Sequence, residues 1–191
     1  VCDRPAENRR WQEPLLRLLD GMENADRTLR IHAGRVENMA MRIASQMGLS
    51  GERLFPLQIA ALLHDIGKIG LPARILDKPG ALSGPELRLV KAHSVRGEQI
   101  LRKMDLPEET CRAVRGHHER CDGMGYPDGL RGEEIPLGAR ILGVADAYVA
   151  LTEERPYRPA LSFRTASDWV AALAGIRFDP AVVRHFLAVP S

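Results

Sequence analysis

Two aspartates of the chain stand where a carboxylate is costly to bury. Asp146 is the single charged residue in the apolar run 141–152, and Asp65 follows His64 at the end of another apolar run. A buried carboxylate needs a cation or several hydrogen bonds to compensate its lost hydration. Taken singly, Asp146 could lie on a helix surface or pair with Arg140, and His64-Asp65 could be a core histidine held by its neighbour.

Histidines make a metal site the stronger interpretation. Five of the six histidines fall near predicted helix ends or on predicted core-facing positions: His32, His64, His93, His117 and His118. A lone histidine there is more often a satisfied core residue or a partner of the helix dipole. As a set with Asp65 and Asp146, they offer imidazole and carboxylate without cysteine, which suits Fe, Mn, Zn or Ni. Seven such groups exceed the needs of one ion and fit two ions that share a carboxylate.

The segments that would position these groups are predicted to be helical. Apolar residues recur at steps of three and four from His32 to Met47, which is the helical period. Ser83 with Glu86, and Asp105 with Glu108, have the spacing of a capping box. The expected fold class is therefore all-α, with an ordered Gly- and Pro-rich loop over 119–136 that holds at most one small hairpin. Helices are expected over 11–22, 32–47, 56–63, 83–100, 105–118, 137–152, 162–174 and from 179 onward.

One domain is expected to carry the chemistry. Residues 28–191 form it, and residues 1–27 are expected to be a lead-in helix or a linker. At 191 residues the chain is long enough to bury a substantial core. Because the chain begins with Val1, one interpretation is a longer parent protein with an N-terminal sensor or receiver domain.

Composition argues against several other classes of protein. The formal net charge of +2 is too small to predict binding to duplex nucleic acid or to a membrane surface. No apolar run approaches the roughly 20 residues of a membrane helix, so no membrane segment is expected. The three cysteines, Cys2, Cys111 and Cys121, are an odd number, which favours reduced thiols in a cytoplasmic protein.

Three stretches carry these residues in a fixed order: LLHDIGKIGLPARILDKPGALSGPE, HHERCDGMGYPDGLRGEEIP and ARILGVADAYVALTEERPYRPA. Together they resemble the HD-GYP subfamily of the HD superfamily of metal-dependent phosphohydrolases, whose Gly-Tyr-Pro falls at Gly125-Tyr126-Pro127. The similarity runs from about Thr28 to Val183. It implies an HD-domain helical bundle with the Gly/Pro-rich loop near the active site. It also implies hydrolysis of cyclic di-GMP to pGpG, often continuing to GMP.

The resemblance implies a role for each candidate residue. One metal would be held by His32, His64, Asp65 and Asp146, and Asp65 would bridge to a second held by His93, His117 and His118. Lys68 would contact the substrate phosphate and, with Asp65, is expected to be catalytic. Arg155 and Arg158 match basic residues with the same phosphate-binding purpose. Tyr126 is expected to pack, with stacking on a base as the alternative. The expected cofactors are divalent transition-metal ions, Fe or Mn first and Ni or Zn as alternatives.

A dinuclear site of this kind suggests a mechanism. Two cations roughly 3.5–4 Å apart would lower the pKa of a shared water, and the resulting hydroxide would attack the phosphorus. Lys68 and the cations would neutralise charge on the non-bridging phosphate oxygens.

Two positions depart from the family pattern. Thr28 stands where some members have a glutamate ligand for a third metal, so two metals are expected. Val149 stands where the family usually has a second aspartate, and the loss of that polar group could weaken binding or catalysis. Two alternatives stay open. One is an inactive HD-GYP module that binds cyclic di-GMP, or a signalling partner through its Gly-Tyr-Pro loop; the other is an HD hydrolase of another nucleotide phosphoester.

Overall fold

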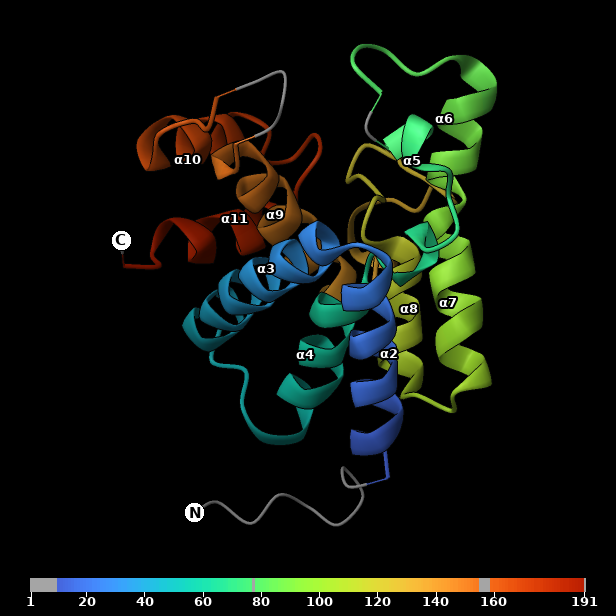
Figure 1. The fold of residues 1–191 in the computed structure, drawn as a ribbon. Helices are drawn as coiled ribbons and strands as arrows, with labels where there is room; N and C mark the ends of the chain where they lie inside the picture. The colour runs from blue at the N-terminus through green and yellow to red at the C-terminus, as the bar shows by residue number, and fades with distance from the viewer. Residues whose placement is uncertain (1–9, 77, 155–158, 191) are drawn as a thin grey trace.

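The computed structural model describes residues 10–76, 78–154 and 159–190, and the helices and 3₁₀ turns within them are joined by loops (Figure 1). The β-type pairings in these ranges are isolated bridges, Asp122 with Arg131 and Ala174 with Phe178. The expected all-α fold class is confirmed, and the hairpin allowed for in the Gly-rich loop is reduced to a single bridge. In the same ranges, none of the helices combines the length and the apolar character that crossing a bilayer requires.

The helices are joined by connections of very different length, the longest of them between α8 and α9. The α-helices are α2 (Gln12–Ala25), α3 (Arg27–Gln46), α4 (Leu54–Leu63), α5 (Ala73–Leu76), α6 (Gly84–Lys91), α7 (His93–Lys103), α8 (Glu108–Gly116), α9 (Leu137–Thr152), α10 (Phe163–Ala172) and α11 (Pro180–Leu187). Single 3₁₀ turns lie between them at η1 (Gly51–Arg53), η2 (Ile66–Lys68) and η3 (Gly132–Glu134).

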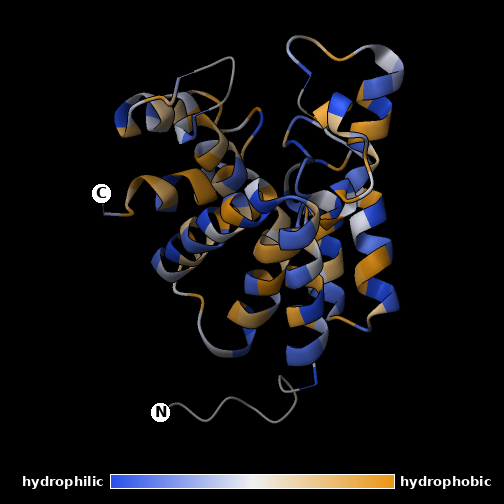
Figure 2. Ribbon diagram, viewed as in Figure 1, coloured by the Kyte–Doolittle hydropathy of each residue, from blue (hydrophilic) through white to orange (hydrophobic). Residues whose placement is uncertain are grey.

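The core forms where α3, α4, α8 and α9 pack on one another. Their most buried side chains include Ile59 and Leu63 of α4 and Ile141 and Leu142 of α9. Helices α10 and α11 flank this centre on one side, and α6 and α7 flank it on the other (Figure 1). Most helices carry both hydrophobic and hydrophilic residues, as amphipathic packing requires (Figure 2).

Helix α2 lies where a lead-in helix was expected, and it packs on α3 and α4. Its Met22 is fully buried, and the Trp11 indole N–H before it donates to the Asp105 carbonyl at 2.7 Å. Asp26 then caps α3 by accepting from the Thr28 backbone N–H at 2.8 Å. The domain boundary expected at residue 27 stays a prediction.

The helix expected over 83–100 is instead two helices, α6 and α7, which meet at Ala92. Its start is confirmed, because the Glu86 carboxylate accepts from the Ser83 backbone N–H at 2.7 Å. The interruption lies where η2 presses against the chain. A Cβ on Gly67 would come within 2.0 Å of the His93 carbonyl oxygen, so the two backbones are in direct contact.

The cap expected at Asp105 is wrong. Pro107 precedes α8 without a side-chain cap, and Asp105 lies earlier in the connection between α7 and α8, with a φ of 52°. Aspartate tolerates this left-handed conformation better than most residues, which explains its position there. Glu108 pairs with Arg102 at 2.6 Å. The Asp179 cap is confirmed, since its carboxylate accepts from the Ala181 backbone N–H at 2.7 Å.

Candidate metal centre

Seven side chains meet where α3, α4, α7, α8 and α9 converge. They are the seven residues expected from the sequence: His32, His64, Asp65, His93, His117, His118 and Asp146. The rings form a continuous row, with centroid separations of 5.5 Å for His32 and His64, 5.2 Å for His64 and His117, and 4.0 Å for His117 and His118. Segments far apart in sequence therefore supply one compact group of nitrogen and oxygen atoms.

The first part of the group is built on α3, the end of α4 and α9. The ligand-type atoms of His32, His64 and Asp65 all lie within 4.8 Å of one another. Asp146 Oδ1 joins them, at 3.1 Å from His32 Nε2 and 4.0 Å from His64 Nε2. The alternative pairing of Asp146 with Arg140 is wrong, because Arg140 binds Asp179 at 2.6 Å.

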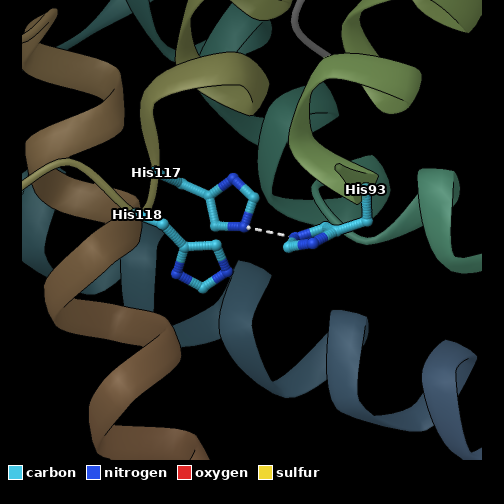
Figure 3. Close-up of side chains that lie close together, drawn as sticks. All are labelled: His93, His117 and His118. Atoms are coloured by element: carbon cyan, nitrogen blue, oxygen red, sulfur yellow. Dashed lines mark hydrogen bonds between the residues drawn. The ribbon is translucent and has the colours of Figure 1, made fainter. Parts of the chain in front are cut away.

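The second part is built on the start of α7 and the end of α8. His93, His117 and His118 also place their ligand-type atoms within 4.8 Å of one another, and their rings converge in Figure 3. His93 Nε2 and His117 Nε2 are 3.3 Å apart. Asp65 reaches both parts, with Oδ2 at 3.5 Å from His64 Nε2 and Oδ1 at 3.4 Å from His93 Nε2.

Helix ends orient three of these rings. The Nδ1 atoms of His64, His93 and His117 lie 2.9, 2.6 and 2.6 Å from the carbonyl oxygens of Ala61, Val90 and Val114, each three residues earlier. The last carbonyls of a helix lack an intrahelical partner and are free to accept. A carbonyl cannot donate, so each Nδ1 carries the proton. The Nε2 atom of each ring is then left facing the centre.

Two buried atoms of the centre have no hydrogen-bond partner in the described residues: His64 Nε2 and Asp65 Oδ1. Leaving such atoms unsatisfied costs on the order of 1–3 kcal/mol each, and more for a charged group. Both atoms are donors to transition metals and both point into the centre. The residues present therefore fit divalent cations, which would satisfy both atoms.

Protonation states favour metal binding in the second part. Burial lowers the pKa of His93 and of His117, and it lowers the pKa of His118 to about 3. These rings are thus neutral near pH 7, which is the form that binds a metal.

The carboxylates are ionised despite their burial. Burial acts to raise the pKa of Asp65, but the charge of Lys68 and the neighbouring His64 hold it well below its usual value. For Asp146, burial is again opposed, here mainly by the hydrogen bond from His32, and the pKa is lowered. In the opposite sense, burial acts to lower the pKa of His32, but its hydrogen bonds to Asp146 and Glu153 raise it to about 9.

The predicted substrate-binding residues lie partly within the described chain. Lys68 Nζ donates to Asp65 Oδ2 at 2.6 Å, and its side chain is 22% exposed at the edge of the centre. The Tyr126 ring lies 4.9 Å from the His118 ring, and Lys91 Nζ lies 4.9 Å from the Tyr126 centroid. Arg155 and Arg158 lie outside the described residues. The substrate contacts of all four stay predictions.

The Gly-rich loop is ordered around one buried acid. Glu119 accepts from the backbone N–H groups of Asp128, Gly129 and Leu130 at 2.6, 3.1 and 3.1 Å. These bonds bring the loop back towards the end of α8, next to His118.

Both departures from the family pattern can be located. The Thr28 hydroxyl donates to Asp26 at 2.6 Å, within the start of α3. Val149 is 4% exposed and belongs to the hydrophobic core.

One residue of the centre was missed from the sequence. Glu153 Oε2 lies 2.9 Å from His32 Nδ1, and Glu153 Oε1 lies 3.2 Å from Arg35. Its one sequence signal was its position directly after the apolar helix that carries Asp146.

Comparison with known proteins agrees with this geometry. A family model described as "HD domain" matches residues 16–182, and the chain belongs to the HD domain family. The HD-GYP resemblance is confirmed by relatives that bear cyclic dinucleotide phosphodiesterase names. The chain is 41% identical over 181 residues to "Cyclic di-GMP phosphodiesterase response regulator RpfG" of Xanthomonas campestris, covering 93% of this chain and 48% of that protein. It is 47% identical over 130 residues to "3'3'-cGAMP-specific phosphodiesterase 3" of Vibrio cholerae, covering 68% of this chain and 28% of that protein.

A solved structure shares the fold. An HDG"Y"P protein from Bdellovibrio bacteriovorus superposes with a TM-score of 0.70 at 22% identity, covering 88% of this chain and 54% of that one. The chain thus spans less than half the length of the two curated relatives.

Proposed function

We propose that the chain is a metal-dependent phosphodiesterase that hydrolyses cyclic di-GMP to pGpG and onward to GMP. The observation that carries the proposal is the convergence of seven metal-binding side chains around two unpartnered buried atoms, His64 Nε2 and Asp65 Oδ1. The names of the relatives support the substrate class.

The proposed centre takes two divalent transition-metal ions. His32, His64, Asp65 and Asp146 would hold one, and Asp65, His93, His117 and His118 would hold the other. Fe or Mn is favoured, with Ni or Zn as alternatives, because the ligands combine imidazole and carboxylate without thiolate. Such a pair of ions supplies Lewis acidity and activation of water near neutral pH.

The chain's own residues bind and orient the substrate in this proposal. Lys68 holds its ammonium group beside Asp65 at the edge of the centre, where it can meet a phosphate oxygen. Arg155 and Arg158 are proposed to bind the same phosphates, since a guanidinium can donate two parallel hydrogen bonds to them. One face of Tyr126 is near His118 and its ring also meets Lys91, so we propose that it packs against the second part of the centre.

The test is turnover of a nucleotide panel. The chain would be loaded anaerobically with Fe(II), Mn(II), Ni(II) or Zn(II) and incubated with cyclic di-GMP, 3'3'-cGAMP and cyclic di-AMP. Products would be resolved by chromatography. We expect cyclic di-GMP to be consumed and pGpG to appear first. If cyclic di-GMP survives while another nucleotide disappears, the proposed substrate is wrong and the proposed enzyme class stands.

A second candidate is a module that binds the cyclic dinucleotide without cutting it. It is favoured by Val149, whose buried apolar side chain stands where the family usually has an acid. Tight binding of cyclic di-GMP without product under any of the metals would support it.

The regulatory domain, the signalling partner and the cellular location are each proposed from a different observation. The Xanthomonas relative is named a response regulator, which supports a receiver or sensor domain in a longer parent protein. The ordered Gly-Tyr-Pro loop is the surface we propose for a signalling partner. Cys111 and Cys121 are free thiols, which supports a reducing, cytoplasmic location.

A further inference from the structure

The ring of His32 cannot be oriented in the way the other helix-borne rings are. His64, His93 and His117 each use Nδ1 to reach a carbonyl three residues earlier, at or near a helix end. His32 lies inside α3, which runs from Arg27 to Gln46. The carbonyls one turn before it belong to the hydrogen-bond ladder of the helix. An acceptor for His32 Nδ1 must therefore come from another element.

Glu153, the residue that follows α9, supplies this acceptor. Its Oε2 lies 2.9 Å from His32 Nδ1, although the two residues are 121 positions apart. Its second oxygen accepts from Arg35 at 3.2 Å. The Glu153 side chain is only 14% exposed, so both of its oxygens are engaged away from bulk water.

The contact with Arg35 does not by itself explain this placement. The Arg35 side chain is 59% exposed, and exposed ion pairs contribute little to stability. The contact with His32 is the shorter and more buried of the two. The same contact fixes the orientation of the His32 ring, so that His32 Nε2 on its other side faces Asp146 Oδ1 at 3.1 Å.

We infer that Glu153 is a positioning residue of the metal centre. Its carboxylate accepts the Nδ1–H of His32, so Nε2, which faces Asp146, is the ring nitrogen that can bind a metal once its own proton is released. A carboxylate behind a histidine ligand fixes the ring and raises the basicity of the ligating nitrogen. Glu153 thus does for His32 what helix-end carbonyls do for the other rings. The inference rests on the proposed metal site.

The test measures metal affinity on the full chain, with Co(II) as the probe under anaerobic conditions. Affinity would be obtained by competition with a chelator, and the ligand-field absorption of Co(II) would report the geometry. Glu153→Met removes the acceptor at similar size, and Glu153→Gln keeps an oxygen that can accept from Nδ1. Glu154→Met is the matched control on the exposed neighbour, and Arg35→Met removes the ion pair alone. Should Glu153→Met fail to fold, Glu153→Ala takes its place.

We expect Glu153→Met to weaken one Co(II) site by roughly 10–100-fold and to alter its absorption, as loss of such an acceptor does elsewhere. Glu153→Gln is expected to retain most of the affinity, and Glu154→Met and Arg35→Met to match the parent chain. Unchanged affinity in Glu153→Met, or an equal loss in Arg35→Met, would overturn the inference while the metal site stands. A parent chain that binds no Co(II) would overturn the proposed function and this inference together.

Discussion

At the scale of single residues, hydrogen bonds to Nδ1 orient the histidine rings of the candidate metal centre. Four rings have a defined acceptor behind Nδ1, three on backbone carbonyls and one on Glu153. Their Nε2 atoms are therefore turned towards the centre before any ligand arrives. Such preorganisation avoids the need to reorient the side chains on binding.

His32 makes the stability of the metal-free chain depend on pH. Its folded-state pKa is about 9, above the value of 6.5 for an unperturbed histidine. The stabilisation from its hydrogen bonds to Asp146 and Glu153 is then fully present below pH 6.5 and is lost as the pH rises through about 9. The loss amounts to at most about 3–4 kcal/mol, from 1.36 kcal/mol for each unit by which the two pKa values differ.

Urea unfolding of the metal-free chain and of His32→Gln, from pH 6.5 to 9.5, measures this effect. The parent is expected to be the more stable at pH 6.5, with the difference shrinking towards pH 9.5. If the difference in free energy of unfolding between the parent and His32→Gln stays constant with pH, His32 is not the group that makes stability depend on pH.

Residue type and local context were enough to single out the seven side chains that the structure brings together. An acid in an apolar helix and histidines at helix ends are visible in the sequence. Glu153 was missed because its partner lies 121 positions away, and the partner of Arg140 was mistaken for the same reason. Pairings between distant segments follow from tertiary packing, which local patterns do not contain.

At the scale of elements, the contact of η2 with α7 holds the two halves of the centre together. Gly67 lies so close to the His93 carbonyl that a Cβ would come within 2.0 Å of it and within 2.7 Å of Gly97 N. Gly67→Ala is expected to lower the free energy of unfolding by about 1–3 kcal/mol or more, as overpacking does. It should also weaken metal binding at His93.

Gly21→Ala is the matched control, because nothing lies within 4 Å of its Cβ position in α2. It is expected to raise stability by about 0.5–1 kcal/mol, the usual gain for alanine inside a helix. Denaturant unfolding of both variants measures the contrast. Equal stabilities would show that the close contact is not maintained in solution.

The Gly-rich loop depends on Glu119. Glu119→Ala removes the acceptor for three backbone N–H groups of the loop, so the loop should open and the peptide bonds after Arg120 and Arg131 should fit the trypsin active site more readily. Limited proteolysis is expected to cut this variant several-fold faster than the parent chain. Glu133→Ala, on the exposed side of the loop, should digest at the parental rate; equal rates for both variants would contradict the role of Glu119.

Periodicity predicted the long helices well and their junctions less well. α9 was expected over the residues it occupies, because an apolar run bounded by Pro136 and a charged end leaves little choice. The division between α6 and α7 at Ala92 was not expected, and it coincides with the place where Gly67 of η2 touches the His93 carbonyl. The prediction that Asp105 caps α8 was wrong because the spacing of a capping box does not show whether an aspartate caps the next helix or lies in the turn after the previous one.

At the scale of the whole molecule, the fold brings distant segments of the chain together at the candidate metal centre. His32 and Asp146 are 114 positions apart and lie 3.1 Å from each other. Bound cations would link five helices, so the free energy of metal binding adds to that of folding. Family membership, from residue 16 to residue 182, agrees with a site that draws on most of the chain.

Metal analysis of the purified chain beside Asp65→Ala tests the central claim most directly, with exposed Asp168→Ala as the control. The parent and Asp168→Ala are expected to hold about two equivalents of transition metal, as a dinuclear centre requires. Asp65→Ala, which loses the carboxylate between both parts of the centre, is expected to hold little or none. A parent chain without transition metal, or an Asp65→Ala chain that keeps its full content, would contradict the account.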